Sequence, residues 1–412
     1  MYKLDKDKWV NFTIRGQLFY HHLDERSKGK EQGHRSYFEM TEAEFYAKGQ
    51  ITKRFQFFTQ WECYYKPIAL DGKNRDDKEP GYKKNRAFMK ETGVNLVFAP
   101  EFKIRFGRIR IPVSRYHQRS DYKKIIPTDY FYRYDVYGIF KKKEGGTLSY
   151  TRGLGFDKTA LKIREPGILF LGDTFNGMFR YYVGLFNQPN SDYEDVRPTI
   201  RLAFTPTILG FKPESSLKGT RGDSYLGKKD IFTIGFGYSR EKINPSKLWG
   251  KTAPTFNNDM FAVDATFEKK FETKFGSIVP NLGIGYIWAK KTHLANVLNV
   301  TNGLGSGSLG GPQDSHFWWV QGQLLYDREI GFGKPAIAVR HEQMVSENAY
   351  NDEDVVLNRW SACLHYFLQG YNAWISVGVD YINYDDGAAE LLNAKDLNNS
   401  MLDWNFYFQF RF

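Results

Sequence analysis

The C-terminal stretch MLDWNFYFQFRF alternates between apolar and polar side chains. One parity holds large apolar residues from Leu402 to Phe412, and the other holds mainly polar ones such as Asp403 and Arg411. Side chains alternate faces along a β-strand, so one face of this strand is wholly apolar. Such a strand fits a wall between lipid and water better than it fits a soluble β-sandwich.

The same alternation recurs along the whole chain in segments of about ten residues. These segments are residues 11–20, 42–51, 55–65, 92–98, 102–111, 167–174, 177–186, 199–206, 230–239, 260–271, 278–289, 316–327, 335–343, 357–368, 373–383 and 401–412. No long helical pattern separates them, which argues against a parallel α/β fold. About sixteen strands predict one all-β domain over residues 1–412, a transmembrane antiparallel β-barrel with an aqueous channel.

Closure of this barrel requires that its first and last strands pair, because unpaired backbone groups in lipid cost several kcal/mol each. We therefore expect strand 401–412 to pair with strand 9–20 and Phe412 to face lipid.

The predicted connections alternate between short periplasmic turns, such as 99–101 and 175–177, and long extracellular loops. The long polar loops are 21–38, 66–90, 113–160, 209–229, 241–258, 290–315, 343–354 and 384–400. The longest, 113–160, follows the fifth strand and begins with a run of basic residues. We expect this loop to fold into the pore.

Composition agrees with a membrane barrel, because 17% of the residues are aromatic although a quarter are charged. No run of about 18 apolar residues is present, which excludes a transmembrane helix. Cys63 and Cys363 belong to no paired motif, so we expect neither a disulfide framework nor a metal site, and no cofactor is implied. The charged N-terminus is no secretory signal, and we expect the sequence to be a mature form.

The formal net charge is +11, and residues 101–145 hold twelve basic and five acidic residues. In segment 102–111, Ile109 and Ile111 resume the apolar face of Phe106 after a slip of one residue, which predicts a β-bulge at Gly107. The bulge would turn the basic residues of this strand into the lumen, because a guanidinium facing lipid costs about 2–4 kcal/mol. With the loop that follows, this predicts a basic constriction formed by Lys103, Arg105, Arg108, Arg110, Arg115, Arg119, Lys123 and Lys124.

Other basic residues are expected inside the barrel or at its loop tips. The further inward candidates are Arg15, Arg180, Arg201, Arg340 and Arg411. Residues 141–143 and 228–229 are lysines for which we expect loop tips that face solvent or lipopolysaccharide. The alternative to a net basic constriction is that the lumen arginines pair with acids across the pore.

Three stretches, residues 104–133, 164–187 and 197–206, resemble the phosphate-selective porin O and P family. The resemblance implies a barrel of sixteen strands in the cell outer membrane, a homotrimer, and a constriction lined by arginine and lysine. Under this reading, the subunit contact would include small and aromatic residues of the early strands: Ala43, Phe45, Ala47, Gly49 and Phe57.

The favoured functional hypothesis is a passive outer-membrane porin. A basic constriction favours anions, and arginine forks suit phosphate or other small oxyanions. Its partners would be outer-membrane lipid, lipopolysaccharide and small anions. The alternative is a barrel that serves as a structural sheath for a partner such as an electron-carrying cytochrome. No Ser–His–acid arrangement predicts an enzyme, and no recognition motif predicts nucleic-acid binding.

Overall fold

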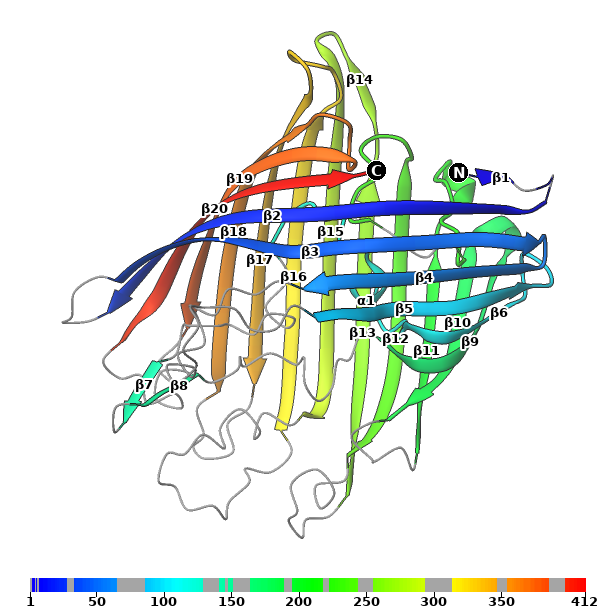
Figure 1. Ribbon diagram of the computed structural model, residues 1–412, viewed down its shortest axis with the longest axis horizontal. Coiled ribbons are helices and arrows are strands. Elements are labelled where there is room, and N and C mark those ends of the chain that lie inside the picture. Colours follow the sequence, from blue (N-terminus) through cyan, green and yellow to red (C-terminus); the bar gives the residue numbers. More distant parts are fainter. Residues whose placement is uncertain are drawn as a thin grey trace.

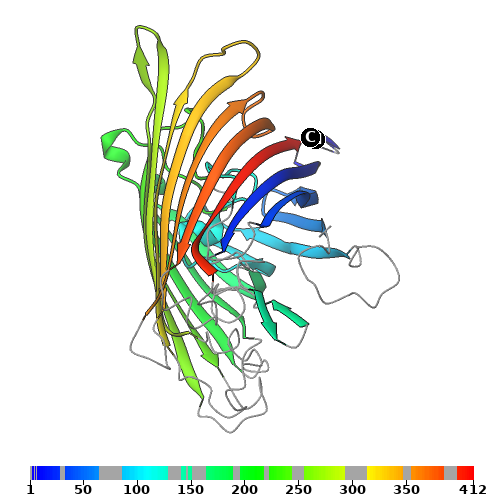
Figure 2. The same cartoon turned by 90° about the vertical axis from the view of Figure 1, so that its left-hand side faces the viewer.

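The computed structural model describes residues 2–3, 5, 7–27, 33–64, 86–128, 141–144, 147–150, 164–188, 195–217, 222–243, 255–292, 313–346, 354–384 and 397–412. They form a closed antiparallel barrel of sixteen strands (Figure 1), and Figure 2 shows the same barrel from the side. The one α-helix in these ranges, α1, is the single turn Arg115–Gln118. No described helix has the length and apolar character needed to cross a membrane.

The barrel strands follow one another around the wall in chain order. They are β2 (Trp9–Ser27), β3 (Gly33–Thr52), β4 (Phe55–Tyr64), β5 (Arg86–Val97), β6 (Lys103–Arg110), β9 (Arg164–Thr174), β10 (Phe179–Asn187), β11 (Val196–Phe204), β12 (Ile231–Ile243), β13 (Phe256–Glu268), β15 (Gly276–Thr292), β16 (Gln313–Tyr326), β17 (Lys334–Ser346), β18 (Val355–Phe367), β19 (Ala373–Tyr384) and β20 (Leu397–Arg411). Each overlaps one of the sixteen predicted segments, so the predicted strand count is confirmed.

Smaller elements complete the secondary structure. Strand β1 (Tyr2–Lys3) pairs with β2, and β14 (Phe271–Thr273) pairs with β15. Strands β7 (Lys141–Glu144) and β8 (Thr147–Tyr150) form a separate two-stranded sheet. Two 3-10 turns, η3 (Phe175–Gly177) and η5 (Thr207–Leu209), follow β9 and β11.

The barrel closes where the two ends of the chain meet, as the sequence predicts. Strand β20 pairs with β2, with Arg411 opposite Arg15, and the amide of Phe412 donates to the carbonyl of Ile14 at 3.0 Å. The blue and red ribbons of Figure 1 show these strands side by side. Phe412 is 83% exposed and shares the outward parity of Trp404 and Phe406. The sheet therefore has no open edge at this seam.

The predicted alternation of faces is visible in β11. Ile200 and Leu202 are exposed, whereas Arg201 and Ala203 between them are buried. An exposed apolar outer face and a buried polar inner face are what a strand between lipid and an aqueous lumen requires.

The connections alternate between the two ends of the barrel. One segment predicted as an extracellular loop lies at the end that carries the short turns. Short connections, such as 53–54 and 175–178, join strands at what we call the turn end. Residues 205–217 and 222–230 also lie at the turn end, because they follow the eighth barrel strand, β11. The prediction of 209–229 as an extracellular loop is therefore wrong, and the connection 188–195 takes that place at the opposite, loop end.

Much of the predicted loops lies outside the described residues. This applies to most of 66–90, 241–258, 290–315, 343–354 and 384–400, and to residues 129–140, 145–146 and 151–163 of loop 113–160.

Two segments enter the barrel interior from opposite ends. The loop-end segment, residues 111–128, follows β6, and its Gln118, Ser120 and Asp121 are buried. The turn-end segment consists of residues 205–217 and 222–230. The two segments meet inside, where the amide of Asp223 donates to the carbonyl of Lys123 at 2.9 Å.

Apolar side chains fill the lumen along the wall from β15 through β20 to β2. The larger cluster consists of Phe19, Leu226, Val279, Leu325, Ala336, Phe367, Trp374 and Tyr407. Leu226 belongs to the turn-end segment, so this cluster packs that segment against the wall. A second cluster joins Ile125 and Ile126 of the loop-end segment to Ala338 of β17 and Cys363 of β18.

Candidate functional site: the polar interior of the barrel

Only some of the basic residues of β6 reach the lumen, although all four were predicted to do so. The register of β6 with β5 and β9 is continuous through Gly107, so the predicted bulge is absent. Arg108 is exposed and keeps the outward parity of Phe106. Ile109, expected to face lipid, is instead buried and lines an interior cavity. The assignment of Arg108 to the constriction is therefore wrong.

The other three basic side chains of β6 point inward and have partners. Lys103 Nζ lies 2.8 Å from Asp173 Oδ2 and 3.2 Å from Ser216 Oγ. Arg105 donates from Nε to Asn95 Oδ1 at 2.7 Å and from Nη2 to the Leu217 carbonyl at 2.7 Å.

Arg110 closes the strand and contacts both the wall and the loop-end segment. Its Nε lies 2.6 Å from Glu91 Oε1, which Arg164 of β9 contacts as well. Its Nη1 donates to the carbonyl of Arg119. The Glu91 carboxylate is therefore shared by two guanidinium groups.

The basic residues of the loop-end segment bind the turn-end segment. Arg115 Nη1 lies 2.8 Å from Glu214 Oε2, and Arg119 Nη1 lies 3.0 Å from Asp223 Oδ2. Burial alone would raise the pKa of Glu214, but Arg115 and Arg180 hold it well below its usual range. Glu214 is thus an anion permanently paired with two arginines.

The two remaining predicted residues of the loop-end segment, Lys123 and Lys124, differ in how deeply they are buried. Lys124 is buried, and its Nζ donates to the carbonyl of Pro127 at 3.4 Å. Lys123 is only partly buried and lines the interior cavity.

The further inward candidates are all on the inner face, where three of them tie the interior segments to the wall. Arg201 forms a bidentate pair with Asp264 of β13 at 2.8 and 2.7 Å, and Asp264 also accepts from the amide of Arg115. Arg180 contacts Glu214 at 3.1 Å, and Arg340 donates to the carbonyl of Thr128 at 3.1 Å.

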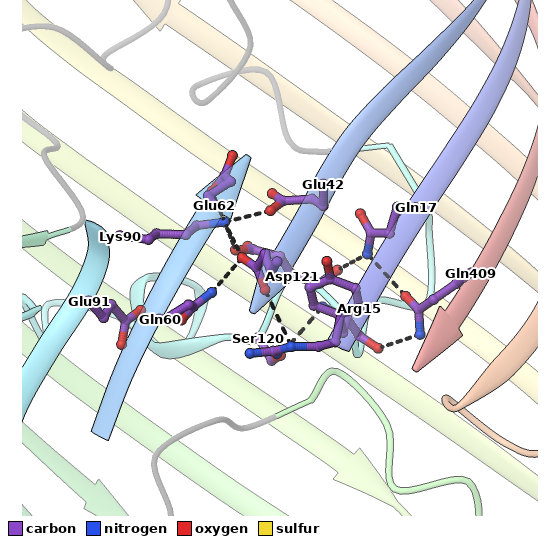
Figure 3. Close-up of polar contacts among 12 residues, drawn as sticks. Arg15, Gln17, Glu42, Gln60, Glu62, Lys90, Glu91, Ser120, Asp121 and Gln409 are labelled. Atoms are coloured by element: carbon purple, nitrogen blue, oxygen red, sulfur yellow. Dashed lines mark hydrogen bonds and ion pairs between the residues drawn. The ribbon is translucent and has the colours of Figure 1, made fainter. Parts of the chain in front are cut away.

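A buried cluster of carboxylates around one lysine was not predicted. Lys90 Nζ lies 2.6 Å from Glu42, 2.8 Å from Glu44, 2.6 Å from Glu62 and 3.1 Å from Asp121. Figure 3 shows Lys90 reaching between Glu62 and Glu42, with Asp121 of the loop-end segment beside them. We call these five residues the Lys90 cluster.

Two bulges build the Lys90 cluster. The register of β2 with β3 skips Thr41, and the register of β4 with β5 skips Lys90. The second bulge turns both Lys90 and Glu91 inward, where a regular strand would place only one of them. Oxygens of Glu42, Glu44 and Glu62 lie within 4.8 Å of one another, as in a metal site. The Lys90 ammonium contacts all three, so a positive charge of the protein itself already compensates part of their negative charge.

Beside these ion pairs lies a cavity of about 830 Å³. Six basic side chains and two carboxylates line it, together with aromatic residues of β2, β3 and β4. The basic residues are Lys48, Arg105, Arg110, Lys123, Lys229 and Arg411. The carboxylates are Glu91 and Glu214, each already paired with two arginines. The cavity surface is therefore net positive.

Three of these cations, Arg105, Lys123 and Arg411, have no carboxylate within ion-pair distance in the described part of the chain. Arg105 is nevertheless held by Asn95 and by the Leu217 carbonyl. Burial, together with the positive charges of Arg411 and Lys48, lowers the pKa of Lys123 to about 8. This amine is therefore charged at neutral pH but within reach of titration.

The structure thus brings together part of the predicted set and adds to it. Arg105, Arg110 and Lys123 line the cavity, whereas Lys103, Arg115, Arg119 and Lys124 contribute to contacts around it. Lys229 is no loop tip, because its Nζ donates to the carbonyl of Pro213 inside the barrel. Lys48 could have been found from the sequence, since it shares the inward parity of Glu44.

Solved structures with this fold are bacterial outer-membrane channels. The anion-selective porin from Comamonas acidovorans is 11% identical, covers 98% of this chain and 100% of its own, and has a TM-score of 0.55. OmpF of Salmonella typhi, in complex with daunomycin, is 12% identical over 97% of both chains, with a TM-score of 0.53. The channel DcaP of Acinetobacter baumannii is 9% identical over 99% of both chains, with a TM-score of 0.50. No family model and no curated protein matches the sequence.

At these identities, the comparisons show the fold, which is that of an outer-membrane porin. The resemblance to the phosphate-selective family and the absence of enzymatic activity stay predictions. Nothing in the described residues or the comparisons supports the alternative of a sheath for a cytochrome. The loop-end and turn-end segments of the protein itself occupy part of the lumen.

Proposed function

We propose that the protein is a passive diffusion channel of the Gram-negative outer membrane and that its lumen favours anions. The exposed apolar residues of the strands match a lipid-facing surface, and lipid with lipopolysaccharide would surround it. One observation carries the anion preference: the cavity holds six basic side chains, and its two carboxylates are already paired.

The preference for anions follows from electrostatics in a confined space. Fixed positive charges in a narrow water-filled pore attract anions and repel cations, and a low-dielectric wall screens them less than open solvent does. Loop 113–160 contributes through its described part, because Lys123 lines the cavity together with Arg110 of β6. We propose that the whole loop narrows the pore.

The test is a reversal potential in planar bilayers under a KCl gradient, with the purified full chain. We expect a potential of the sign that chloride selectivity gives. A cation-selective potential would overturn the proposal. Inorganic phosphate then tests the finer hypothesis of a phosphate channel, because a phosphate site would reduce the chloride current as phosphate is added.

We also propose a homotrimer, supported by the apolar outer face of the early strands. Phe12, Ile14 and Phe45 are exposed there. Two of the five residues predicted for the subunit contact are covered within the chain itself, because Ala47 is only 5% exposed and the ring of Phe57 covers Gly49. Light scattering in mild detergent should give three times the mass of one chain; a monomeric mass would contradict this prediction.

A further inference from the structure

The lining of the cavity described above combines two kinds of side chain. Lys123 and Arg411 contribute positive charge, and the inward side chains Trp9 of β2, Tyr46 of β3 and Phe58 of β4 contribute aromatic surface. A channel for small inorganic ions needs only the first of these.

The aromatic side chains of the cavity are held in place by their neighbours. Phe58 is 8% exposed, and the guanidinium of Arg105 lies 5.4 Å from the centre of its ring. Arg105 is in turn fixed by Asn95 and the Leu217 carbonyl. Tyr46 stacks against Arg15, whose guanidinium lies 4.9 Å from the ring centre. These rings are therefore positioned before any ligand arrives, which lowers the entropic cost of binding.

Two of the basic side chains in the cavity are available to an anionic ligand. In the described residues, Lys123 and Arg411 lack a carboxylate partner, so a visiting anion would not have to displace one. The cavity volume of about 830 Å³ falls within the range of small-molecule sites and far exceeds what one inorganic oxyanion fills.

We propose that this cavity binds organic anions in which a carboxylate is joined to an aromatic ring. The carboxylate would lie against Lys123 and Arg411, and the ring against Phe58 and Trp9. This inference rests on the proposed anion channel and names its preferred class of permeant. Inorganic phosphate would meet the same cations but leave the aromatic surface unused.

Benzoate, acetate and inorganic phosphate are suitable probes, because benzoate and acetate share the carboxylate and differ in the ring. Each is titrated against the chloride current of the full chain in planar bilayers, at one pH and ionic strength. We expect half-inhibition by benzoate at a concentration about fivefold lower than by acetate, the size of effect that an aromatic contact gives. Phosphate should inhibit more weakly than benzoate.

Two variants separate the ring contact from the charge contact. Phe58→Leu should weaken benzoate inhibition about threefold and leave acetate unchanged. Trp9→Leu provides a second test if Phe58→Leu does not fold. Lys123→Gln should weaken inhibition by both carboxylates. Phe236→Leu, on the lipid-facing side of β12, is the matched control and should change neither.

Equal inhibition by benzoate and acetate would overturn the proposal, as would equal losses for both probes in Phe58→Leu. Stronger inhibition by phosphate than by benzoate would also overturn it. All three outcomes leave the anion channel standing. That proposal fails by itself if the reversal potential in KCl, measured before any probe is added, is cation-selective.

Discussion

The two sides of the lumen are built on different principles. Along β15 to β20, apolar side chains such as Trp374 and Leu325 pack with Leu226 of the turn-end segment. Along β2 to β6, the inner face instead carries the Lys90 cluster and the basic cavity. The wall from β15 to β20 is filled largely by packing, although β17 and β18 also carry buried ion pairs among Arg340, Glu342 and Arg359. The wall from β2 to β6 instead presents charged side chains to the lumen, so we expect ions to pass beside β2 to β6.

The charged side should be the more vulnerable to a single substitution. Lys90→Met removes the ammonium shared by Glu42, Glu44, Glu62 and Asp121. Glu44 keeps Arg15 and Asp121 keeps Arg164, but the buried Glu42 and Glu62 lose their only cationic partner among the described residues. Breaking a buried ion pair costs about 3–5 kcal/mol. We expect a loss of that size in urea unfolding of the detergent-solubilised barrel.

Lys53→Met is the control for this prediction, because its side chain is 77% exposed and its contact to Asp7 is long, at 3.8 Å. Adding Glu42→Gln and Glu62→Gln to Lys90→Met should restore part of the lost stability. An unchanged unfolding midpoint in Lys90→Met would show that the cluster does not hold the structure together.

A substitution on the apolar side should cost less stability than Lys90→Met and should leave the conductance unchanged. Leu325→Val removes one methylene from the larger apolar cluster, where Leu325 is 1% exposed. Deleting one buried methylene costs about 1 kcal/mol. Unfolding measures that loss, and single-channel recording should give the conductance of the unchanged protein. An altered conductance would place the path of ions on this side too.

The smallest expected effect is a pH dependence of selectivity. Lys123, with a pKa of about 8, carries its charge below that pH and loses it as the pH rises further. The ratio of anion to cation permeability should therefore fall about twofold between neutral pH and one unit above the pKa. Reversal potentials measure this change. Lys123→Gln should show the low ratio at every pH, and a pH-dependent Lys123→Gln would assign the titration to another group.

The wall of the barrel could be predicted from the sequence because its signal is local. Alternation of side chains fixes which residues of a strand face lipid, and β20 needs no knowledge of its neighbours. The end of the barrel at which each connection lies can also be predicted, because the connection after the eighth strand must return to the turn end. The length and polarity of 209–229 do not reveal this, whereas counting the strands does.

The interior could be predicted only in part, because its signal is not local. A bulge is a mismatch between two strands, so the extra residues Thr41 and Lys90 emerge only from the pairing with β2 and β4. The glycine at 107 suggested a bulge that the register does not contain. Whether an arginine is paired depends likewise on contacts across the lumen, as between Arg115 and Glu214.

The meeting of the two interior segments has a mechanical consequence. One comes from the loop end and the other from the turn end, and Arg115, Arg119 and Asp223 join them midway. Neither can be withdrawn through its own mouth without breaking ion pairs with the other. The joined segments therefore brace each other inside the barrel, so we expect that displacing one of them also displaces the other.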